Sequence, residues 1–530
     1  MRCTDKLFTT LVSVLAAANL FAAGRAHHVV VLVWDGMRPD FVTEEDAPTL
    51  FGLARQGVTF KNHHPVYISA TIVNGTALAT GVYPGQSGIV GNAEFRPAIS
   101  ATKQIATESL AAARKGDALT GNHYLAFPTV AETLHGQGLR TAVAAAKTVG
   151  LLHDRFARAD ESQGVVLFLG KVLPESLAPK LAAQLGPFPP AEKSGIERDS
   201  WTTSALIGPL WEKEVPAFSL LWLSEPDASQ HKHALGSPAA LAAIKSSDAN
   251  LARVLEALEQ KGLRQQTDII VVSDHGFSTI GRNAGVFKTL SDHGFHVRRS
   301  YPQTGPGPDD ILLVDNGGSV FLYVAGHAPA LIEKVVHFLQ AQPFSGVLFT
   351  RQSVAGAFAL DQAKLDAPTA PDIVLSLRWN SDRNKYGVPG YISSESKDYG
   401  AGQGMHGSLS HFDMHNTCIA AGPDFRNGLA DDLPTGNIDI APTVLCLLGV
   451  QPLEKLSGRI LAEALVEPPD PAPSARSFHL EATCRASAFV WRQRLDCSTV
   501  GQTLYLDQGN GEQTPAVTLG GGSPPASSSQ

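Results

Sequence analysis

Acidic and imidazole side chains follow those apolar segments of the sequence that have the composition of buried strands. Asp35 comes directly after the run 28–34, and Asp274 and His275 come just after the run 268–272. Both runs are rich in β-branched residues, as is typical of strands buried on both faces of a parallel sheet. Because open α/β sheets carry their sites at the carboxyl ends of such strands, we expect these three side chains to lie close together.

A second group of the same residue types begins after another apolar run, 217–223. Asp227 and His231 are four residues apart, so a helical turn or a tight loop can direct both side chains at one point. His406 lies in the segment 404–407, where glycines let the backbone approach closely while the imidazole points outward. Taken singly, such an Asp is more often a helix cap and such a His a hydrogen-bonded surface residue.

Together, these three aspartates and three histidines form a set of metal ligands. Carboxylate and imidazole groups without thiolates suit zinc, and other divalent first-row metals also accept them. Six side chains are too many for one tetrahedral ion and predict a site for two Zn²⁺. Two-metal sites stabilise both the attacking and the leaving oxygen of a phosphoryl displacement.

One hydroxyl, that of Thr71, stands at the start of a predicted short helix that Gly81 ends. The free N–H groups and the positive end of the dipole at such a position favour an alkoxide or a phosphate. From this stretch alone, the commoner alternative is that Thr71 is a helix N-cap. The metal ligands predicted around it favour a nucleophilic Thr71 instead.

Lys147 ends the predicted strand 140–146, where a lysine is ordinarily solvated. The segment 291–294 repeats the Ser-Asp-His-Gly sequence of 273–276, but only the latter follows a buried strand. We therefore expect Asp274 and His275 to bind metal and the repeat to be a surface turn.

His411 and His415 lie near His406 in the sequence. They are candidates for contacts with the metal ligands or with the substrate.

Apolar strands alternate with helical segments along most of the chain. The predicted strands are 28–34, 58–60, 140–146, 217–223 and 268–272, and the predicted helices are 49–56, 129–137, 238–261 and 440–448. This alternation predicts an α/β sandwich whose largely parallel central sheet is flanked by helices. The segment 96–124 is predicted to be an irregular excursion over the surface, and 150–215 to hold broken helical pieces.

The rhythm of strands and helices changes between residues 277 and 400, which we interpret as an inserted α+β cap subdomain. The catalytic core is then expected to comprise 27–276 and 401–465, and a partly disordered extension to follow at 466–530. Cys484 and Cys497 in this extension could pair in an oxidising compartment, whereas the apolar surroundings of Cys418 and Cys446 indicate inert core thiols.

Residues 1–26 have the pattern of a secretory signal, with Arg2 and Lys6 before the apolar run 7–23 and small residues at its end. A membrane anchor is the alternative, but the run is short for a bilayer span and contains polar residues. We therefore expect a soluble periplasmic or secreted protein without a membrane anchor. The net charge of −8 and the lack of basic runs give no support for nucleic-acid binding.

The sequence resembles the alkaline phosphatase superfamily and, within it, the type I phosphodiesterase/nucleotide pyrophosphatase family. The matching segments occur in the family's order over roughly residues 28–450 and are 33–39, 71–84, 88–92, 225–231, 273–276 and 405–407. As a set these motifs are specific, whereas any one alone would be weak. The resemblance implies an alkaline-phosphatase-like core that hydrolyses phosphodiester or pyrophosphate bonds of small molecules.

The resemblance also implies a role for each residue. One zinc would be held by Asp227, His231 and His406, and the other by Asp35, Asp274 and His275, with Thr71 beside that second ion. Thr71 would be the nucleophile that forms a phosphothreonine, and Asn92 would donate a hydrogen bond to a non-bridging phosphate oxygen.

The chain departs from the family's pattern near Thr71. Ile72 and Gly75 replace the aromatic and histidine residues that are common there, which weakens the case for a nucleobase slot. Lys147 resembles a phosphate-contacting lysine of the Thr-nucleophile monoesterases and phosphonoacetate hydrolases, but their second basic residue is Val149 here. The alternative function is thus a phosphomonoesterase or phosphonate hydrolase, and a non-catalytic binding protein is disfavoured by the full ligand set.

Overall fold

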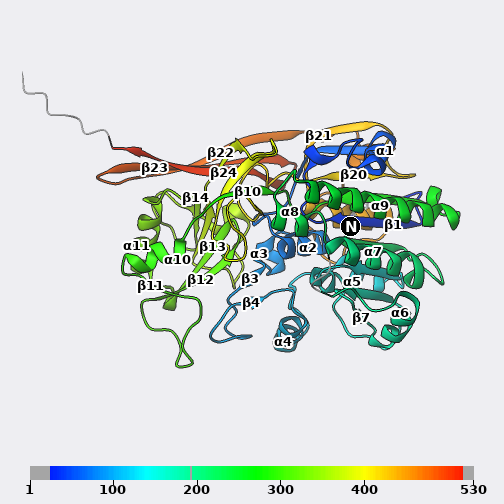
Figure 1. The fold of residues 1–530 in the computed structure, drawn as a ribbon, viewed down its shortest axis with the longest axis horizontal. Coiled ribbons are helices and arrows are strands. Elements are labelled where there is room, and N and C mark those ends of the chain that lie inside the picture. The colour runs from blue at the N-terminus through cyan, green and yellow to red at the C-terminus, as the bar shows by residue number, and fades with distance from the viewer. Residues whose placement is uncertain (1–23, 191–193, 517–530) are drawn as a thin grey trace, which may run out of the picture.

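The computed structural model describes residues 24–190 and 194–516 and is built around a nine-stranded sheet (Figure 1). In spatial order its strands are β21 (Leu429–Gly436), β2 (Val58–His64), β20 (Cys418–Ala421), β9 (Thr267–Val272), β1 (His28–Trp34), β8 (Phe218–Leu223), β5 (Thr141–Ala145), β6 (Gly164–Phe168) and β7 (Lys171–Leu173). Strands β9, β1, β8, β5 and β6 run parallel, whereas β20 and β7 are antiparallel to their neighbours.

The central strand β1 shows why these apolar runs form the middle of the sheet. Val29, Val31 and Val33 enter the core on one face, and Leu32 and Trp34 enter it on the other. Successive strand residues point to opposite faces, so a run without polar residues can be buried only between two layers.

Helices supply both layers. One face is covered by α1 (Pro48–Gln56), α7 (Gly195–Ala205) and α9 (Pro238–Gln260), and the other by α2 (Thr71–Thr80), α5 (Val130–His135) and α12 (Ile440–Leu447). The predicted α/β sandwich is confirmed.

A six-stranded sheet lies beside this core. Its spatial order is β11 (His296–Arg298), β12 (Asp310–Asn316), β13 (Ser319–Val324), β16 (Ile373–Leu377), β14 (Ser345–Thr350) and β15 (Phe358–Ala359). One face packs on α10 (Val286–Asp292) and α11 (Pro329–Gln340), while the other packs on the segment that precedes α2. A four-stranded sheet joins it to the core and contains β17 (Trp379–Arg383), β18 (Pro389–Ser394), β10 (Ser278–Asn283) and β19 (Gly404–Met405).

The C-terminal part of the described chain is a long three-stranded antiparallel sheet along one side of the molecule (Figure 1). It contains β22 (Ala475–Arg485), β23 (Phe489–Val500) and β24 (Thr503–Pro515). In this register Cys484 lies opposite Trp491 and Cys497 lies opposite Phe478, so both thiols are free. The pairing considered from their closeness in sequence is therefore not formed, because the hairpin separates them along the ladder.

Two predicted segments hold more regular structure than expected. The excursion 96–124 contains helix α4 (Leu110–Thr120) and the short strand β4 (Ile105–Ala106), which pairs with β3 (Ala93–Glu94). The helical pieces predicted in 150–215 are present as α6 (Ala178–Leu185) and α7, but the region also contains β6 and the edge strand β7. Such short strands carry too few residues for a clear periodicity, which explains why they were missed.

The predicted signal at 1–26 lies almost wholly outside the described residues, as does the end of the extension predicted to be disordered. Among the described helices, none combines the length and apolarity that a bilayer span requires.

Candidate active site

Three adjacent strands, β8, β1 and β9, bring the predicted acidic residues to one edge of the sheet. Asp35 follows β1, Asp274 and His275 follow β9, and Asp227 begins the helix α8 (Asp227–His233) after β8. The Asp227 N–H donates to the Asp35 carbonyl at 2.9 Å, which fixes the two turns against each other. All four side chains are buried, as expected for a preorganised ligand set.

Asp227, His231 and His406 form one cluster. The Asp227 Oδ1 atom lies 3.2 Å from Nε2 of His231 and 3.5 Å from Nε2 of His406. One turn of α8 separates Asp227 from His231, and the loop after β19 brings in His406. The predicted convergence of these three residues is what the structure shows.

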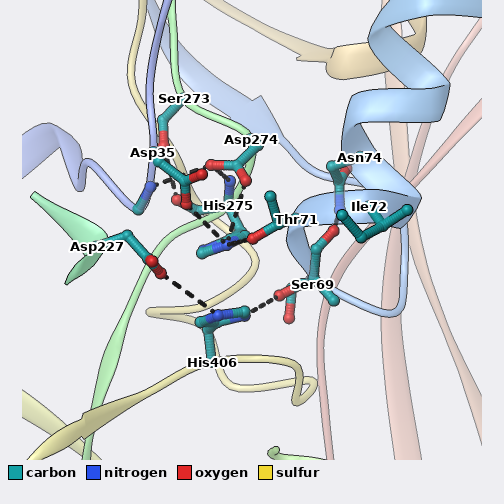
Figure 2. Close-up of polar contacts among 12 residues, drawn as sticks. Asp35, Ser69, Thr71, Ile72, Asn74, Asp227, Ser273, Asp274, His275 and His406 are labelled. Atoms are coloured by element: carbon teal, nitrogen blue, oxygen red, sulfur yellow. Dashed lines mark hydrogen bonds and ion pairs between the residues drawn. The ribbon is translucent and has the colours of Figure 1, made fainter. Parts of the chain in front are cut away.

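Asp35, Asp274 and His275 form a second cluster directly beside the first. Nε2 of His275 lies 3.3 Å from Asp274 Oδ2 and 3.6 Å from Asp35 Oδ1. Asp35, Asp227 and His275 also have ligand atoms close enough to share one ion, so Asp227 stands between the two clusters. Figure 2 shows these carboxylates directed toward His275 and His406.

The hydrogen bonds of the His231, His275 and His406 rings determine which ring nitrogen is free to bind metal. Nδ1 of His231 faces the Gly404 carbonyl at 3.0 Å, Nδ1 of His275 faces that of Gly276 at 2.9 Å, and Nδ1 of His406 faces that of Ser69 at 2.9 Å. A carbonyl can only accept, so each Nδ1 carries the proton. Each neutral ring therefore directs the lone pair of Nε2 toward a carboxylate oxygen.

Three of those oxygens are buried and make no hydrogen bond among the described residues: Asp35 Oδ1, Asp227 Oδ1 and Asp274 Oδ2. Lone pairs of nitrogen and oxygen that face each other at 3.2–3.6 Å repel unless a cation lies between them. Backbone carbonyls that orient ligating histidines through Nδ1 are the usual outer shell of a metal site. The residues present thus fit divalent metal ions.

The charges of the site point to the same conclusion. Burial raises the pKa of Asp35 to about 8, with repulsion from Asp274 adding to it, and burial raises the pKa of Asp274 to about 7. Burial also holds the pKa of His406 well below its usual value, with His275 adding to the effect. Without added positive charge these carboxylates resist ionisation, and bound cations reverse that tendency.

Thr71 is the first residue of α2, and its Oγ1 lies 3.2 Å from Nε2 of His275. Ala70 occupies the N-cap position and no side chain caps the helix. The N-cap alternative for Thr71 is therefore wrong. The hydroxyl instead faces the second cluster (Figure 2).

Asn92 lies beside this helix start. Its Oδ1 accepts a hydrogen bond from the Ile72 N–H at 2.8 Å. The acceptor end of the amide is thus occupied, and its NH₂ group is the end that remains for a substrate oxygen.

The Lys147 side chain points into the site and contacts two of the predicted metal ligands. Its Nζ lies 2.9 Å from Asp35 Oδ2 and 3.0 Å from Asp227 Oδ2. Burial alone would lower the pKa of Lys147, but Asp227 and Asp35 hold it well above its usual value. The lysine therefore stays charged and joins one carboxylate from each cluster.

Gly75 and Val149, two departures from the family's pattern, pack against each other. A Cβ on Gly75 would lie 2.3 Å from Cγ2 of Val149 and 3.2 Å from the Trp222 ring. Val149 is fully buried, and Ile72 belongs to the same apolar core. Helix α2 therefore packs closely on an apolar wall, and no aromatic side chain follows Thr71 on this side.

A buried amide network supports the site, and no motif in the sequence indicates its extent. Asn74 Nδ2 donates to the carbonyls of Val66, Ile68 and Ala70, so it fixes the segment before Thr71. Its Oδ1 accepts from Asn437 Nδ2 at 3.0 Å, and the same nitrogen donates to the Asp274 carbonyl at 2.7 Å. Asn74 stands inside a recognised motif, whereas Asn437 is marked by no motif.

The repeated Ser-Asp-His-Gly segment is remote from these clusters. Asp292 ends α10 and pairs with Lys288, and His293 faces the Thr289 carbonyl at 2.8 Å. Both Asp292 and His293 are exposed, which agrees with a surface turn.

His411 and His415 also lie apart from the metal clusters. The His415 ring lies beside those of His411 and His64, with centroids 4.1 and 4.6 Å away and ring planes tilted by 40° and 58°. Neither residue contacts a predicted metal ligand among the described contacts.

Comparison with known proteins agrees with this geometry. The model of the family "Type I phosphodiesterase / nucleotide pyrophosphatase" matches residues 29–408. The chain belongs to this family. It is accordingly a phosphodiesterase/nucleotide pyrophosphatase-like hydrolase, and its Asp/His clusters can bind metal.

Among curated relatives, ectonucleotide pyrophosphatase/phosphodiesterase family member 7 of Homo sapiens is 21% identical over 84% of each chain. A venom phosphodiesterase of Macrovipera lebetinus is 24% identical over 53% of this chain, which spans only 29% of that longer protein.

Solved structures show the fold. Human ectonucleotide pyrophosphatase/phosphodiesterase 5 aligns with a TM-score of 0.57 at 18% identity, covering 83% of this chain and 100% of that one. Its murine counterpart, in an inactive form in complex with AMP, aligns with a TM-score of 0.56 at 18% identity, covering 81% of this chain and 96% of that one.

Proposed function

We propose that this family member is a two-zinc hydrolase of small-molecule phosphodiesters or pyrophosphates that works through a phosphothreonine at Thr71. The observation that carries the proposal is the set of three Nε2 lone pairs facing three unpartnered carboxylate oxygens beside one buried hydroxyl. One cluster would hold an ion through Asp227, His231 and His406. The other would hold an ion through Asp35, Asp274 and His275.

Bound zinc would supply Lewis-acid stabilisation of charge on the phosphoryl and leaving oxygens. Thr71 contributes the attacking oxygen, whose position at the start of α2 places it against the positive end of the helix dipole. The Thr71 Oγ–P bond forms as the bond from phosphorus to the leaving oxygen breaks, while the Thr71 hydroxyl gives its proton to solvent and the leaving oxygen takes one from water. Water then cleaves the phosphothreonine, which releases the phosphate product and restores the hydroxyl.

Asn92 is suited to hold a non-bridging oxygen during both displacements. Because its Oδ1 is fixed by the Ile72 N–H, its NH₂ group is oriented before the substrate arrives. A preorganised donor stabilises developing charge without reorganising during the reaction.

One observation favours a second candidate, a phosphomonoesterase or phosphonate hydrolase. Lys147 places a permanent positive charge at the two clusters, within 3.0 Å of a carboxylate of each. A phosphomonoester carries one more negative charge than a diester, so an added cation favours it. The residue after Thr71 is Ile72, so the chain also lacks the aromatic side chain that would stack on a nucleobase there.

The deciding experiment compares bis-p-nitrophenyl phosphate with p-nitrophenyl phosphate on purified enzyme with added zinc. Faster turnover of the diester supports the first function, and the reverse preference supports the second. Metal analysis of the active enzyme should find two zinc ions per chain, and active protein without bound metal would refute the scheme.

A matched pair of variants tests the assignment of the ligands. Asp274→Asn should reduce the zinc content, whereas Asp292→Asn, in the repeated segment, should leave it unchanged. Loss of zinc from the Asp292 variant would contradict the assignment.

We also propose that the protein acts in the periplasm or outside the cell. The predicted signal at 1–26 supports this location, as do relatives whose names describe ectoenzymes and venom enzymes. Cell fractionation with N-terminal sequencing of the mature protein would test it.

A further inference from the structure

The two segments without recognised motifs, the 96–124 excursion and the six-stranded sheet, meet around a second cavity. Its volume is about 670 Å³, within the range of small-molecule sites. Its wall includes the loop after β3, the end of α4 and the end of β13. It contains none of the predicted metal ligands, nor Thr71, Asn92 or Lys147.

Most of the wall is apolar. Pro97, Ile99 and Leu119 line the side formed by the excursion, and Tyr301 and Val324 line the side formed by the sheet. Leu119 is one of few large apolar side chains in the described chain that are more than half exposed. An apolar hollow of this size in water favours the burial of an apolar ligand body.

The wall also carries polar groups, and the one with a permanent charge is Arg96. Arg96 is 8% exposed, and it uses Nε to contact Glu94 at 2.8 Å and Nη2 to contact the Gly88 carbonyl at 2.5 Å. Neither contact uses Nη1. The Tyr323 side chain lines the cavity, but its hydroxyl is enclosed. Glu94 is fully buried and does not belong to the wall, so Arg96 Nη1 is the part of this ion pair that a ligand can contact.

We propose that this cavity is a binding site for an apolar carboxylate, a ligand with an acyl or aromatic body and one anionic head. The body lies against the apolar wall, and the head accepts a hydrogen bond from Arg96 Nη1. This charge-assisted bond to the guanidinium fixes the direction in which the ligand enters. This site is separate from the phosphoryl site and does not depend on the function proposed there.

The charge of the whole protein makes the proposal easy to test. The net charge is −8, so non-specific binding favours a cationic amphiphile over an anionic one. Calorimetric titration with dodecanoate should find one site. Dodecyltrimethylammonium, which has the same chain length and the opposite charge, should bind at least about tenfold more weakly. Equal or tighter binding of the cation would refute the anionic head, and no dodecanoate binding would refute the site.

Two variants locate the binding. Ala98 lines the cavity and is exposed, so Ala98→Trp should fill the space without disturbing the core and weaken dodecanoate binding by about tenfold or more. Ala183→Trp is the control, because Ala183 is exposed on α6 outside this cavity. Unchanged binding in the Ala98 variant would place the ligand elsewhere and overturn the proposal.

Discussion

Replacing Asn437 by Leu should slow the chemical step although Asn437 touches neither metal ligand side chains nor substrate. Leu has nearly the same shape but cannot hydrogen-bond. The change removes the donor to the Asp274 carbonyl and the acceptor for His63 Nε2, both of which are fully buried. It also removes the donor to Asn74 Oδ1, which keeps its bond from the Val66 N–H.

The magnitude follows from these contacts. A buried polar group that loses its partner costs about 1–3 kcal/mol, so two such groups should lower the free energy of unfolding by about 2–6 kcal/mol. The loss also releases the turn that carries Asp274 from the segment that carries Thr71. A displacement of about 1 Å between reacting groups can cost about a hundredfold in rate, and we expect kcat to fall by about that factor.

The assay is steady-state turnover with saturating zinc, at a temperature at which circular dichroism shows the variant fully folded. Asn250→Leu is the matched control, because Asn250 is also a buried amide but lies on α9, away from the site. It should lower stability and leave kcat unchanged. If the folded Asn437 variant kept its kcat within about twofold, the network would be structural only, and the positioning argument would be refuted.

Three further predictions concern the site itself. Thr71→Ala should abolish turnover while zinc stays bound, and measurable turnover with zinc bound would exclude Thr71 as the nucleophile. Lys147→Met should lower kcat/KM for a phosphomonoester more than for a diester, because the doubly charged monoester loses more when the cation is removed. Equal losses would show that Lys147 acts only on the carboxylates of the metal ligands Asp35 and Asp227. In metal-free protein, the raised pKa values of Asp35 and Asp274, about 8 and 7, mean that the folded state keeps protons that the unfolded state has lost. Stability should therefore fall as the pH rises through about 7 to 8, where the unfolded histidines are already largely neutral, and thermal melting should show that zinc removes this dependence.

The candidate site could be predicted in large part because its residues follow buried strands. Asp35, Asp274 and His275 come after runs that can only be central strands, and parallel strands end at the same edge of a sheet. The spacing of Asp227 and His231 likewise needed only one helical turn. The strands β6 and β7 escaped prediction because short strands carry weak periodicity, and helix α4 escaped it because its apolar residues are mostly alanines, interrupted by Gly116.

The amino-acid sequence by itself determined the α/β architecture and the ligand types, since local composition decides which runs must be buried and which side chains can bind metal. Only the tertiary structure decided the environment of those side chains. It directs Lys147 at Asp35 and Asp227, packs Gly75 against Val149, and joins Asn437 to Asp274 across 163 positions of sequence. Such contacts depend on how separate elements approach one another in three dimensions, and no local pattern of residues records that approach.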